Sequence, residues 1–386
     1  MTPDTVELEH DWIRHKFFSQ EVRLNGKLSN IDYTVGGYYS RQDTLLRAIA
    51  DIRPFIPLYD TNDPVPAHTA AAFATVVAPV TPGLTVTGGI RFTHEAKDYT
   101  FYRYSLTGAV IDPAFNGLKV SYSDSVVDYR LSVDYRWNDQ IMTYLTYSTG
   151  FKGGGVNPVP TTAAIALPFK PEKLKNFEGG IRTDLFGRRL RFNVSAFYDE
   201  YDDILATRLS CAEYGLSFCS LVQNVGSAHT KGVEVELSAE PVDGLKINGS
   251  FSYLDFQYKS IAASTGLSLS FVPPYVPEMQ WSLGGQYKID LGSAGSITPR
   301  IDASHQSEMY SNAANASTNR IAPYTLINGS LTWRNEAEDL SVALQVENLA
   351  DKYYVLNNFD IEAFFGMIRD QPGRPRQFSL VVKKRF

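Results

Sequence analysis

The sequence predicts an all-β protein, an antiparallel up-and-down transmembrane β-barrel. The first observation is a period-two alternation of apolar and polar residues along many segments, with little helical periodicity. The second is a regular alternation of short turns and long loops between those segments. The third is composition: 13% of the 386 residues are aromatic, as in proteins that place rings at two membrane interfaces. No apolar run approaches the roughly 18 residues that a membrane-spanning helix needs.

The alternating segments predict about fifteen strands, with ends uncertain by about two to four residues. Their expected bounds are 13–25, 30–42, 67–79, 84–106, 124–137, 140–152, 172–186, 188–206, 220–240, 244–258, 277–291, 296–310, 322–334, 339–353 and 375–386. Val233, Val235 and Leu237 alternate with Glu234 and Glu236 in one of the clearest examples. In a membrane barrel this pattern turns the apolar side chains toward lipid and the polar side chains toward the lumen.

The connections between these strands are alternately short and long. The short ones contain residues that favour tight hairpins and lie at 25–27, 81–83, 138–139, 186–187, 242–244, 293–295 and 335–336. The long ones are rich in Pro, Gly and Ser and lie at 43–66, 107–123, 153–171, 207–219, 259–276, 311–321 and 354–374. Outer-membrane barrels show this alternation, with short periplasmic turns and longer external loops.

Whether the number of strands is odd or even indicates whether the barrel is complete. The last strand is expected to end on the periplasmic side, so an odd number of strands starts the first one outside the cell. A complete bacterial barrel has an even number, with both ends inside. The first residues, MTPDTVELEHDW, show neither a basic nor an apolar region, so no signal peptide is expected. The sequence therefore predicts part of a barrel.

Charge and residue usage argue against several classes of function. The net charge is −6, which argues against non-specific nucleic-acid binding. The two cysteines form no CxxC motif, and the six histidines show no metal-ligand spacing, so no metal site and no cofactor are predicted. Carboxylates on the polar strand faces are interpreted as a hydrated ladder with neighbouring arginines, not as catalytic pairs. They include Asp128, Asp134, Glu234, Glu236 and Glu347. We therefore expect no enzyme activity.

Several short segments, in a fixed order, resemble elements of TonB-dependent outer-membrane receptors. They are 18–24 (FSQEVRL), 144–157 (YLTYSTGFKGGGVN), 169–173 with 176–182, 224–226 with 231–236, 346–354 (VENLADKYY), and 373–376 with the terminal Phe386. Each motif alone is weak, but their shared order and spacing cover nearly the whole chain. The chain is thus similar to the C-terminal barrel portion of this family.

The resemblance implies a barrel of about 22 strands around an N-terminal plug. It also implies import of a scarce ligand, such as a ferric siderophore, with energy delivered through a TonB box upstream of the plug. Residues 1–386 correspond to a partial barrel domain with no plug, lacking about seven strands. We therefore expect an integral outer-membrane protein of a Gram-negative bacterium, surrounded by lipid, that is part of a longer receptor. Contact with the TonB complex would need the missing N-terminal region, and the barrel is expected to remain open or incompletely closed.

Two sequence features in the predicted external loops have structural interpretations. Cys211 and Cys219 are expected to form a disulfide, because the cell surface is oxidising; the alternative is two free thiols. The run Gly153, Gly154, Gly155 does not lie between a strand and a helix, which argues against a phosphate-binding loop. It is interpreted as a flexible exit from a strand into a loop.

Ligand contacts are expected in the external loops and the upper lumen. Aromatic rings there offer stacking surfaces, and cations can pair with an anionic chelate. The candidates are Tyr102, Tyr104, Lys152, Tyr275, Tyr310, Arg320, Phe364, Phe365 and Arg369. The competing interpretation is that the rings belong to the aromatic girdle at the membrane interface.

Other functional classes remain open at this point. The chain could form a passive channel, or it could be a non-functional remnant of a receptor, because an open sheet in lipid leaves backbone groups unsatisfied. A surface β-sandwich is disfavoured by the alternation of loop lengths. The sequence does not identify the ligand, and it does not settle whether the chain closes into a barrel or transports without a plug.

The last strand carries the apolar residues of an assembly signal on one face. Phe378, Leu380, Val382 and Phe386 alternate with polar or smaller residues and resemble the terminal signal that the barrel-assembly machinery reads. Deleting Phe386 should therefore impair assembly, because that ring completes the apolar face. The measurement is heat-modifiable gel migration of outer-membrane fractions. Unchanged migration of the deletion variant would contradict the assignment.

Overall fold

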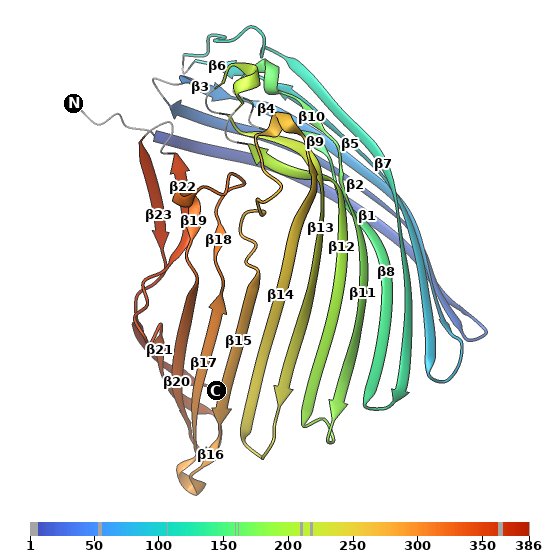
Figure 1. The fold of residues 1–386 in the computed structure, drawn as a ribbon, viewed down its shortest axis with the longest axis vertical. Helices are drawn as coiled ribbons and strands as arrows, with labels where there is room; N and C mark the ends of the chain where they lie inside the picture. Colours follow the sequence, from blue (N-terminus) through green and yellow to red (C-terminus); the bar gives the residue numbers. More distant parts are fainter. Residues whose placement is uncertain are drawn as a thin grey trace.

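A single curved antiparallel sheet dominates the computed structural model, which describes residues 7–52, 56–105, 107–158, 160, 162–208, 211–216, 219–361 and 366–385 (Figure 1). Within these residues, fifteen long strands follow one another around the sheet. They are β1 (Glu7–Leu28), β2 (Ile31–Ile52), β4 (Asp63–Pro79), β5 (Leu84–Phe101), β7 (Leu118–Asn138), β8 (Ile141–Lys152), β11 (Glu172–Leu185), β12 (Leu190–Arg208), β13 (Leu221–Ala239), β14 (Leu245–Ile261), β15 (Met279–Tyr287), β17 (Ser296–Gln306), β20 (Tyr324–Arg334), β21 (Leu340–Glu347) and β24 (Gln377–Lys384).

Each of these strands pairs with the next one in antiparallel register. Shorter strands extend the sheet or form hairpins in the loops. They are β3 (Ile56–Thr61), β6 (Arg103–Tyr104), β9 (Gly155–Val156), β10 (Pro168–Phe169), β16 (Ile289–Asp290), β18 (Met309–Tyr310), β19 (Arg320–Ile321), β22 (Val355–Ile361) and β23 (Met367–Pro372). The up-and-down strand order predicted from the sequence is confirmed.

Short and long connections lie at opposite ends of the sheet. Figure 1 shows the tight turns at the lower end and the long loops with their small hairpins at the upper end. We call these the turn end and the loop end. β1 begins at the loop end and β24 finishes at the turn end, which agrees with the parity argument.

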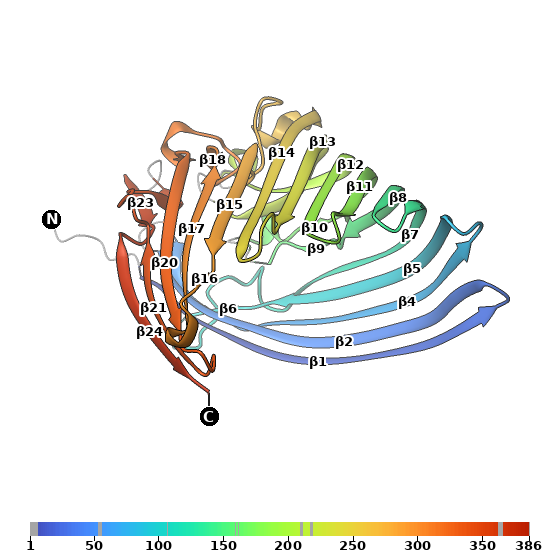
Figure 2. The same cartoon turned by 90° about the horizontal axis from the view of Figure 1, so that it is seen from below.

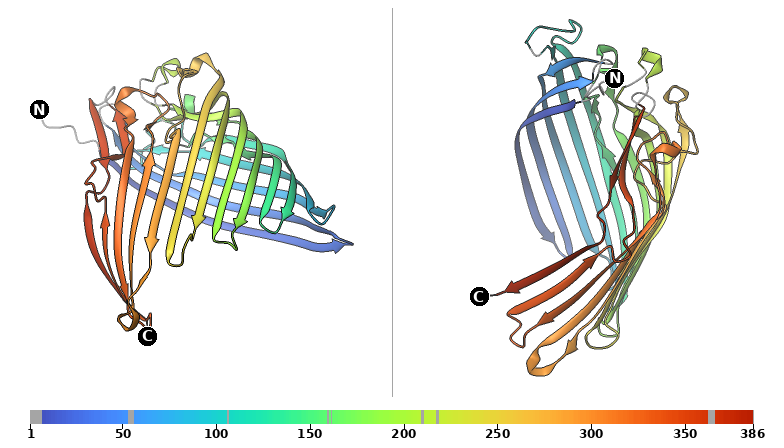
Figure 3. Two further views of the ribbon diagram at one scale, coloured as in Figure 1. Left: turned by 60° about the horizontal axis from the view of Figure 1, so that its bottom comes forward. Right: turned by 90° about the vertical axis from the view of Figure 1, so that its left-hand side faces the viewer.

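The sheet curls without closing. Figure 2 views the structure from below and shows a curved sheet whose two edges do not meet. In both views of Figure 3 the turn ends of β1 and β24 lie well apart. No pairing joins these two edge strands within the described part of the chain. The expectation of an open sheet is therefore confirmed.

The two faces of the sheet differ in polarity, as β7 illustrates. Leu131 and Trp137 are 53% and 64% exposed on the outer face, whereas Ser132 is buried on the opposite face and contacts Thr146 of β8 through a 3.0 Å hydroxyl–hydroxyl hydrogen bond. Large apolar side chains exposed in this way need lipid as their solvent. The outer face therefore suits the membrane, and the inner face suits a hydrated lumen.

Helices contribute little to the fold. Among the residues described, no helix is long and apolar enough to cross a membrane.

Several expected strand boundaries are wrong, each for a local reason. The expected loop at 43–66 is mostly strand, because β1 runs beside β2 as far as the Glu7–Asp51 pair; the apolar residues here fall on both faces and hide the alternation. The first turn lies at Ser29 and Asn30, and Ser29 takes a φ of 57°. Gly26 instead lies beneath the ring of Tyr33, which a Cβ at residue 26 would meet at 2.3 Å.

The strand expected at 339–353 ends at Glu347, because Asn348 organises a loop. Asn348 has a φ of 49°, and its side-chain oxygen accepts a 2.8 Å hydrogen bond from the Lys352 N–H. Its Nδ2 donates to the carbonyl oxygens of Lys352 and Arg374. One buried asparagine thus joins the two ends of the loop. The strand expected at 277–291 is likewise interrupted, since β15 ends at Tyr287 and β16 begins at Ile289.

The polarity of the faces predicts unequal responses to an introduced charge. Val235→Arg places a cation toward lipid in the turn-end half of β13 and should destabilise the barrel by up to about 2–4 kcal/mol. Glu236→Arg, on the neighbouring lumen-facing position, should cost much less because the cation stays hydrated. Urea unfolding in lipid vesicles measures both variants. Equal losses would contradict the assignment of the faces.

Candidate functional site

The loop end of the sheet contains a hydrophobic core of its own, which we call the first loop cluster. It consists of Phe101, Phe115, Tyr122, Val156 and Ala166, all buried. Phe101 and Phe115 meet edge to face, with ring centroids 6.2 Å apart. The residues come from β5, β7, β9 and two loops, so burial of their apolar surface holds those loops together.

A buried ion pair anchors the first loop cluster to β4. The Arg103 Nη1 lies 2.8 Å from the Asp63 Oδ2, and both side chains are 4% exposed. Asp63 also accepts a 2.8 Å hydrogen bond from the Tyr102 N–H. The Arg103 guanidinium lies 4.5 Å from the centroid of the Phe115 ring and donates to the Pro160 carbonyl oxygen. A buried charge pair needs such additional hydrogen bonds to offset its desolvation.

The glycine run follows the end of β8, as expected for an exit from a strand, and it is closely packed beneath this cluster. The Gly154 carbonyl oxygen accepts a 2.7 Å hydrogen bond from the Lys97 Nζ, and the Gly154 N–H donates to the Tyr122 hydroxyl. A Cβ at Gly154 would lie 2.5 Å from the Tyr122 ring, and one at Gly153 would lie 2.3 Å from the Glu95 Oε2. The run therefore permits close approach of backbone to side chains.

A disulfide closes a second loop, between β12 and β13, on itself next to this region. Cys211 and Cys219 are bonded and fully buried, and they pack against Ile165 and Leu221. Arg208 donates to Glu213 from both terminal nitrogens, at 2.5 and 3.2 Å. The hydrogen bond from Arg208 lowers the pKa of Glu213. Covalent and ionic links thus hold this loop over the sheet.

Three loops meet at a separate place, which we call the second loop cluster: Tyr275, Tyr310, Arg320 and Asn357. The Tyr275 N–H donates to the Tyr310 carbonyl oxygen at 2.8 Å, and its hydroxyl donates to the Asn357 Oδ1 at 2.5 Å. Tyr310 lies opposite Arg320 in the β18–β19 pair. Partial burial raises the pKa of Tyr275, so its hydroxyl stays a hydrogen-bond donor at neutral pH.

The structure groups some of the predicted ligand-binding residues and separates others. Tyr102 and Tyr104 stack at the first loop cluster, with centroids 5.9 Å apart. Tyr275, Tyr310 and Arg320 meet in the second loop cluster. Arg320 already holds Glu308 through a 3.0 Å hydrogen bond from Nε, which partly neutralises it.

The remaining candidates lie apart from these groups. Lys152 is exposed at the loop end of β8, opposite Glu172. Arg369 is exposed on β23, opposite Phe359 of β22. Phe364 and Phe365 lie outside the described residues, as does Phe386 of the assembly signal. Phe378, Leu380 and Val382 are between 62% and 69% exposed along β24.

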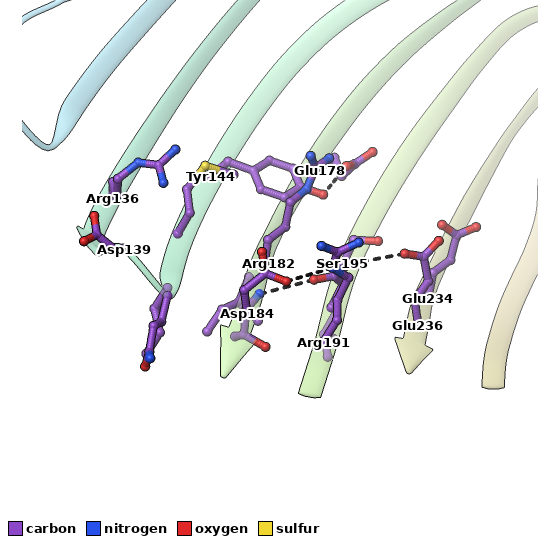
Figure 4. Close-up of a pocket in the computed structure, with 17 residues that line it drawn as sticks. Arg136, Asp139, Tyr144, Glu178, Arg182, Asp184, Arg191, Ser195, Glu234 and Glu236 are labelled. Atoms are coloured by element: carbon purple, nitrogen blue, oxygen red, sulfur yellow. Dashed lines mark hydrogen bonds and ion pairs between the residues drawn. The ribbon is translucent and has the colours of Figure 1, made fainter. Parts of the chain in front are cut away.

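A polar groove of about 570 Å³ lies on the lumen face near the turn end, shown in Figure 4. One row of its wall crosses four strands at Tyr144, Gly180, Ser195 and Glu234. A Cβ at Gly180 would meet the Tyr144 ring at 2.7 Å, so this glycine lets the ring lie across β11. The Tyr144 hydroxyl then donates to the Glu178 Oε1 at 2.5 Å.

Ion pairs and amide hydrogen bonds complete the wall of this groove. Arg182 lies 5.2 Å from the centroid of the Tyr144 ring. Arg191 donates from Nε to the Asp184 Oδ1 at 2.9 Å, and Asn193 donates to the Glu236 Oε2 at 3.3 Å. The carboxylates of Glu178, Asp184 and Glu236 thus each have a donor, an arrangement that suits a hydrated wall better than acid–base chemistry.

Sequence reasoning missed the ion pair and the row that forms the groove. Asp63 and Arg103 are 40 residues apart, and no spacing rule links a residue of an expected loop to one near the end of an expected strand. For the groove, the sequence does contain a signal, because period-two alternation predicts that Glu234 and Glu236 face the lumen. Their neighbours across β11 and β12 depend on register, which the sequence does not state.

The family description "TonB dependent receptor-like, beta-barrel" matches residues 3–349. The fold and the site define a β-barrel of the outer membrane, and this match covers most of the chain. The chain therefore belongs to the TonB-dependent receptor β-barrel family and is an outer-membrane protein of the Gram-negative type.

Named relatives agree with this assignment. The pesticin receptor of Yersinia enterocolitica is 28% identical over 339 residues, which cover 87% of this chain and 47% of the relative. The ferrioxamine B receptor of Salmonella typhimurium is 23% identical over 278 residues, which cover 68% of this chain and 36% of the relative. The chain thus spans about half the length, or less, of the curated relatives it matches.

Two solved structures share the fold of this chain. The ferric yersiniabactin uptake receptor of Yersinia pestis superposes with a TM-score of 0.81 and 22% identity, covering 97% of this chain and 55% of that receptor. The siderophore receptor PiuA of Acinetobacter baumannii gives a TM-score of 0.72 with 15% identity, covering 97% and 56%. The open sheet therefore corresponds to a large part of a receptor barrel.

Removing one partner of the buried ion pair should loosen the first loop cluster. Asp63→Asn removes the carboxylate that pairs with the buried Arg103 guanidinium at 2.8 Å, and breaking a buried ion pair typically costs about 3–5 kcal/mol. The matched control is Asp243→Asn in the exposed pair with Arg189, whose side chains are 90% and 51% exposed; such pairs contribute about 0–1 kcal/mol. Amide hydrogen exchange of residues 107–117 reports the loosening. Equal protection in both variants would contradict it.

Proposed function

We propose that this chain forms the larger part of the barrel of an uptake receptor whose ligand is a small metal chelate, such as a ferric siderophore. The observation that carries the proposal is the shared barrel fold, at a TM-score of 0.81, with a ferric yersiniabactin uptake receptor. Relatives named as receptors for ferrioxamine B and metal-pseudopaline support the same class of ligand. The proposal assigns the chain a binding and transport role and no catalysis.

The second loop cluster is the proposed place of ligand contact. Tyr275 and Tyr310 offer aromatic surfaces at the loop end, and Arg320 adds a cation that a chelate carboxylate could compete for. Three loops supply these side chains, and hydrogen bonds between the loops hold them together. Tyr102 and Tyr104, with Lys152, are proposed as a second set of contacts nearer β8, and Arg369 as a peripheral one.

Energy coupling and assembly involve partners outside the barrel wall. In this proposal the TonB complex acts through a plug region that the 386 residues do not include. The lumen face, including the polar groove, provides the hydrated wall along which the ligand passes. The barrel-assembly machinery is proposed to recognise the outward apolar residues of β24, namely Phe378, Leu380 and Val382 together with Phe386.

A passive channel is the competing function, and the open sheet with its polar lumen face is the observation that favours it. The two functions differ in a direct measurement. A steady ion conductance from this chain alone in a planar bilayer would support the channel. Energy-dependent accumulation of a chelate by cells that carry the complete gene would support the receptor.

Uptake of radiolabelled iron by iron-starved cells tests the ligand assignment. Catecholate, hydroxamate and phenolate chelates are supplied in turn. Tyr275→Ala with Tyr310→Ala should lower uptake of the accepted chelate about tenfold, which corresponds to about 1.4 kcal/mol. The control is Tyr135→Ala with Tyr287→Ala, because these rings are 39% and 45% exposed near the turn end. Unchanged uptake by the loop variant would contradict the assigned contact site.

A further inference from the structure

Two long loops meet at the loop end of the last strands. The loop between β17 and β20 contains β18, the 3₁₀ helix η5 (Ser317–Asn319) and β19, and the loop between β21 and β24 contains the β22–β23 hairpin. β22 lies against η5 and β19, as Figure 1 shows for β19. Across this contact the Thr318 hydroxyl donates a hydrogen bond to the Asp360 Oδ2. The two loops are thus joined beside the second loop cluster.

Three side-chain oxygens in these two loops are buried and have no hydrogen-bond partner within the described part of the chain. They are the Ser311 Oγ, the Asn319 Oδ1 and the Asn358 Oδ1. The side chains of Asn319 and Asn358 belong to residues that are only 1% and 9% exposed. Buried polar atoms are normally paired, and each unpaired one costs about 1–3 kcal/mol. These oxygens therefore point to a bound group that is not protein.

Two of the three oxygens lie side by side. The Ser311 N–H donates to the Asn319 carbonyl oxygen at 2.9 Å, one position beyond the Tyr310–Arg320 pair of β18 and β19. Residues opposite each other in this way project their side chains to the same side. The Asn319 Nδ2 donates to the Asn312 Oδ1 at 2.7 Å, so the oxygen is the end of this amide that is left without a donor.

The β22–β23 hairpin supplies the third oxygen together with two carboxylates. Asn358 lies opposite Asp370 in this hairpin, and its Nδ2 donates to the Asp370 Oδ1 at 2.7 Å. Asp360 follows two residues later, on the same face of β22. Neighbouring residues on one face of such a pair have Cβ atoms about 5–8 Å apart. One ion with metal–oxygen bonds of about 2.3–2.6 Å can contact all three side chains.

The chemistry of these groups selects a hard cation. All the atoms are oxygens, and no three His, Cys, Asp or Glu side chains gather into a metal-ligating group among the residues that the structure describes. This argues against a zinc or copper site, which needs nitrogen or sulfur ligands. Ca²⁺ accepts six to eight oxygens from carboxylates, amides and water in a flexible geometry, whereas Mg²⁺ demands a strict octahedron and keeps most of its waters.

We propose that Ca²⁺ binds between these two loops. Its protein ligands are the carboxylates of Asp360 and Asp370 and the amide oxygens of Asn319 and Asn358, with the Ser311 hydroxyl beside them. Two carboxylates make a weak site, with a dissociation constant of about 0.1–1 mM, as in extracellular calcium-binding modules. The loop end faces the outside of the cell, where such a site is open to the medium.

The ion cross-links the loops that carry the second loop cluster. Asn357, which accepts the Tyr275 hydroxyl hydrogen bond, is the residue before Asn358. A bound ion at Asn358 therefore fixes the segment that holds the Tyr275 ring. The site itself is independent of which ligand the protein imports, since its binding is measured with Ca²⁺ alone.

Amide hydrogen exchange during a Ca²⁺ titration tests the proposal. The protein is expressed from its complete gene, purified in detergent and freed of divalent cations with a chelator. Exchange of residues 317–321 and 355–360 should slow about tenfold when Ca²⁺ reaches ten times the dissociation constant. Asp360→Asn with Asp370→Asn should abolish this response, because both carboxylates are lost. Heat-modifiable migration shows that the variant barrel is folded.

A matched control removes the same charge elsewhere at the loop end. Asp202→Asn with Asp255→Asn takes two carboxylates from ion pairs with exposed lysines and should keep the Ca²⁺ response of residues 317–321. Mg²⁺ at the same concentration should leave exchange unchanged in the natural protein. Equal Ca²⁺ responses in the test and control variants, or equal protection by Mg²⁺, would overturn the proposal.

Asn358→Asp separates a bound ion from a buried water molecule. The new carboxylate lies beside Asp370, so without Ca²⁺ the hairpin should exchange faster than in the natural protein. With Ca²⁺ the protection should return, and the dissociation constant should fall about tenfold, because affinity rises with the charge of the ligands. Faster exchange that Ca²⁺ does not reverse would show that the oxygens hold water only and would overturn the proposal.

Discussion

Every strand of this protein depends on one constraint: in lipid, backbone N–H and C=O groups must be hydrogen-bonded within the protein, because there is no water to replace a missing partner. Antiparallel pairing meets this need, and it runs without interruption from β1 to β24. The outer edges of β1 and β24 are the places where the need is unmet within the described residues. The chain spans about half the length of the curated relatives it matches.

Pairing also separates the chemistry of the two faces. Successive side chains of a strand point to opposite sides, so the lipid receives residues such as Leu131 and the lumen receives residues such as Glu178. Charged groups facing the lumen then gather into donor–acceptor networks, as around Tyr144.

The loops lie in water, outside the paired strands, so contacts within and between the loops must stabilise their shape. Each ordered loop region has its own small core or covalent link: the aromatic first loop cluster with its buried ion pair, the Cys211–Cys219 disulfide, and Asn348 joining the ends of its loop. A receptor needs a recognition surface that holds its shape while the barrel only supports it. The second loop cluster, built from three loops, follows this plan.

The sequence alone determined the fold class, the strand order and the orientation of the sheet, because period-two alternation and turn chemistry are local signals that lie within a few residues of each other. The family followed from ordered motifs. The sequence did not reveal the pairing of Asp63 with Arg103 or the ring of Tyr144 above Gly180. These depend on strand register and loop packing between residues far apart in the chain, and only the tertiary structure decides which side chains share a row.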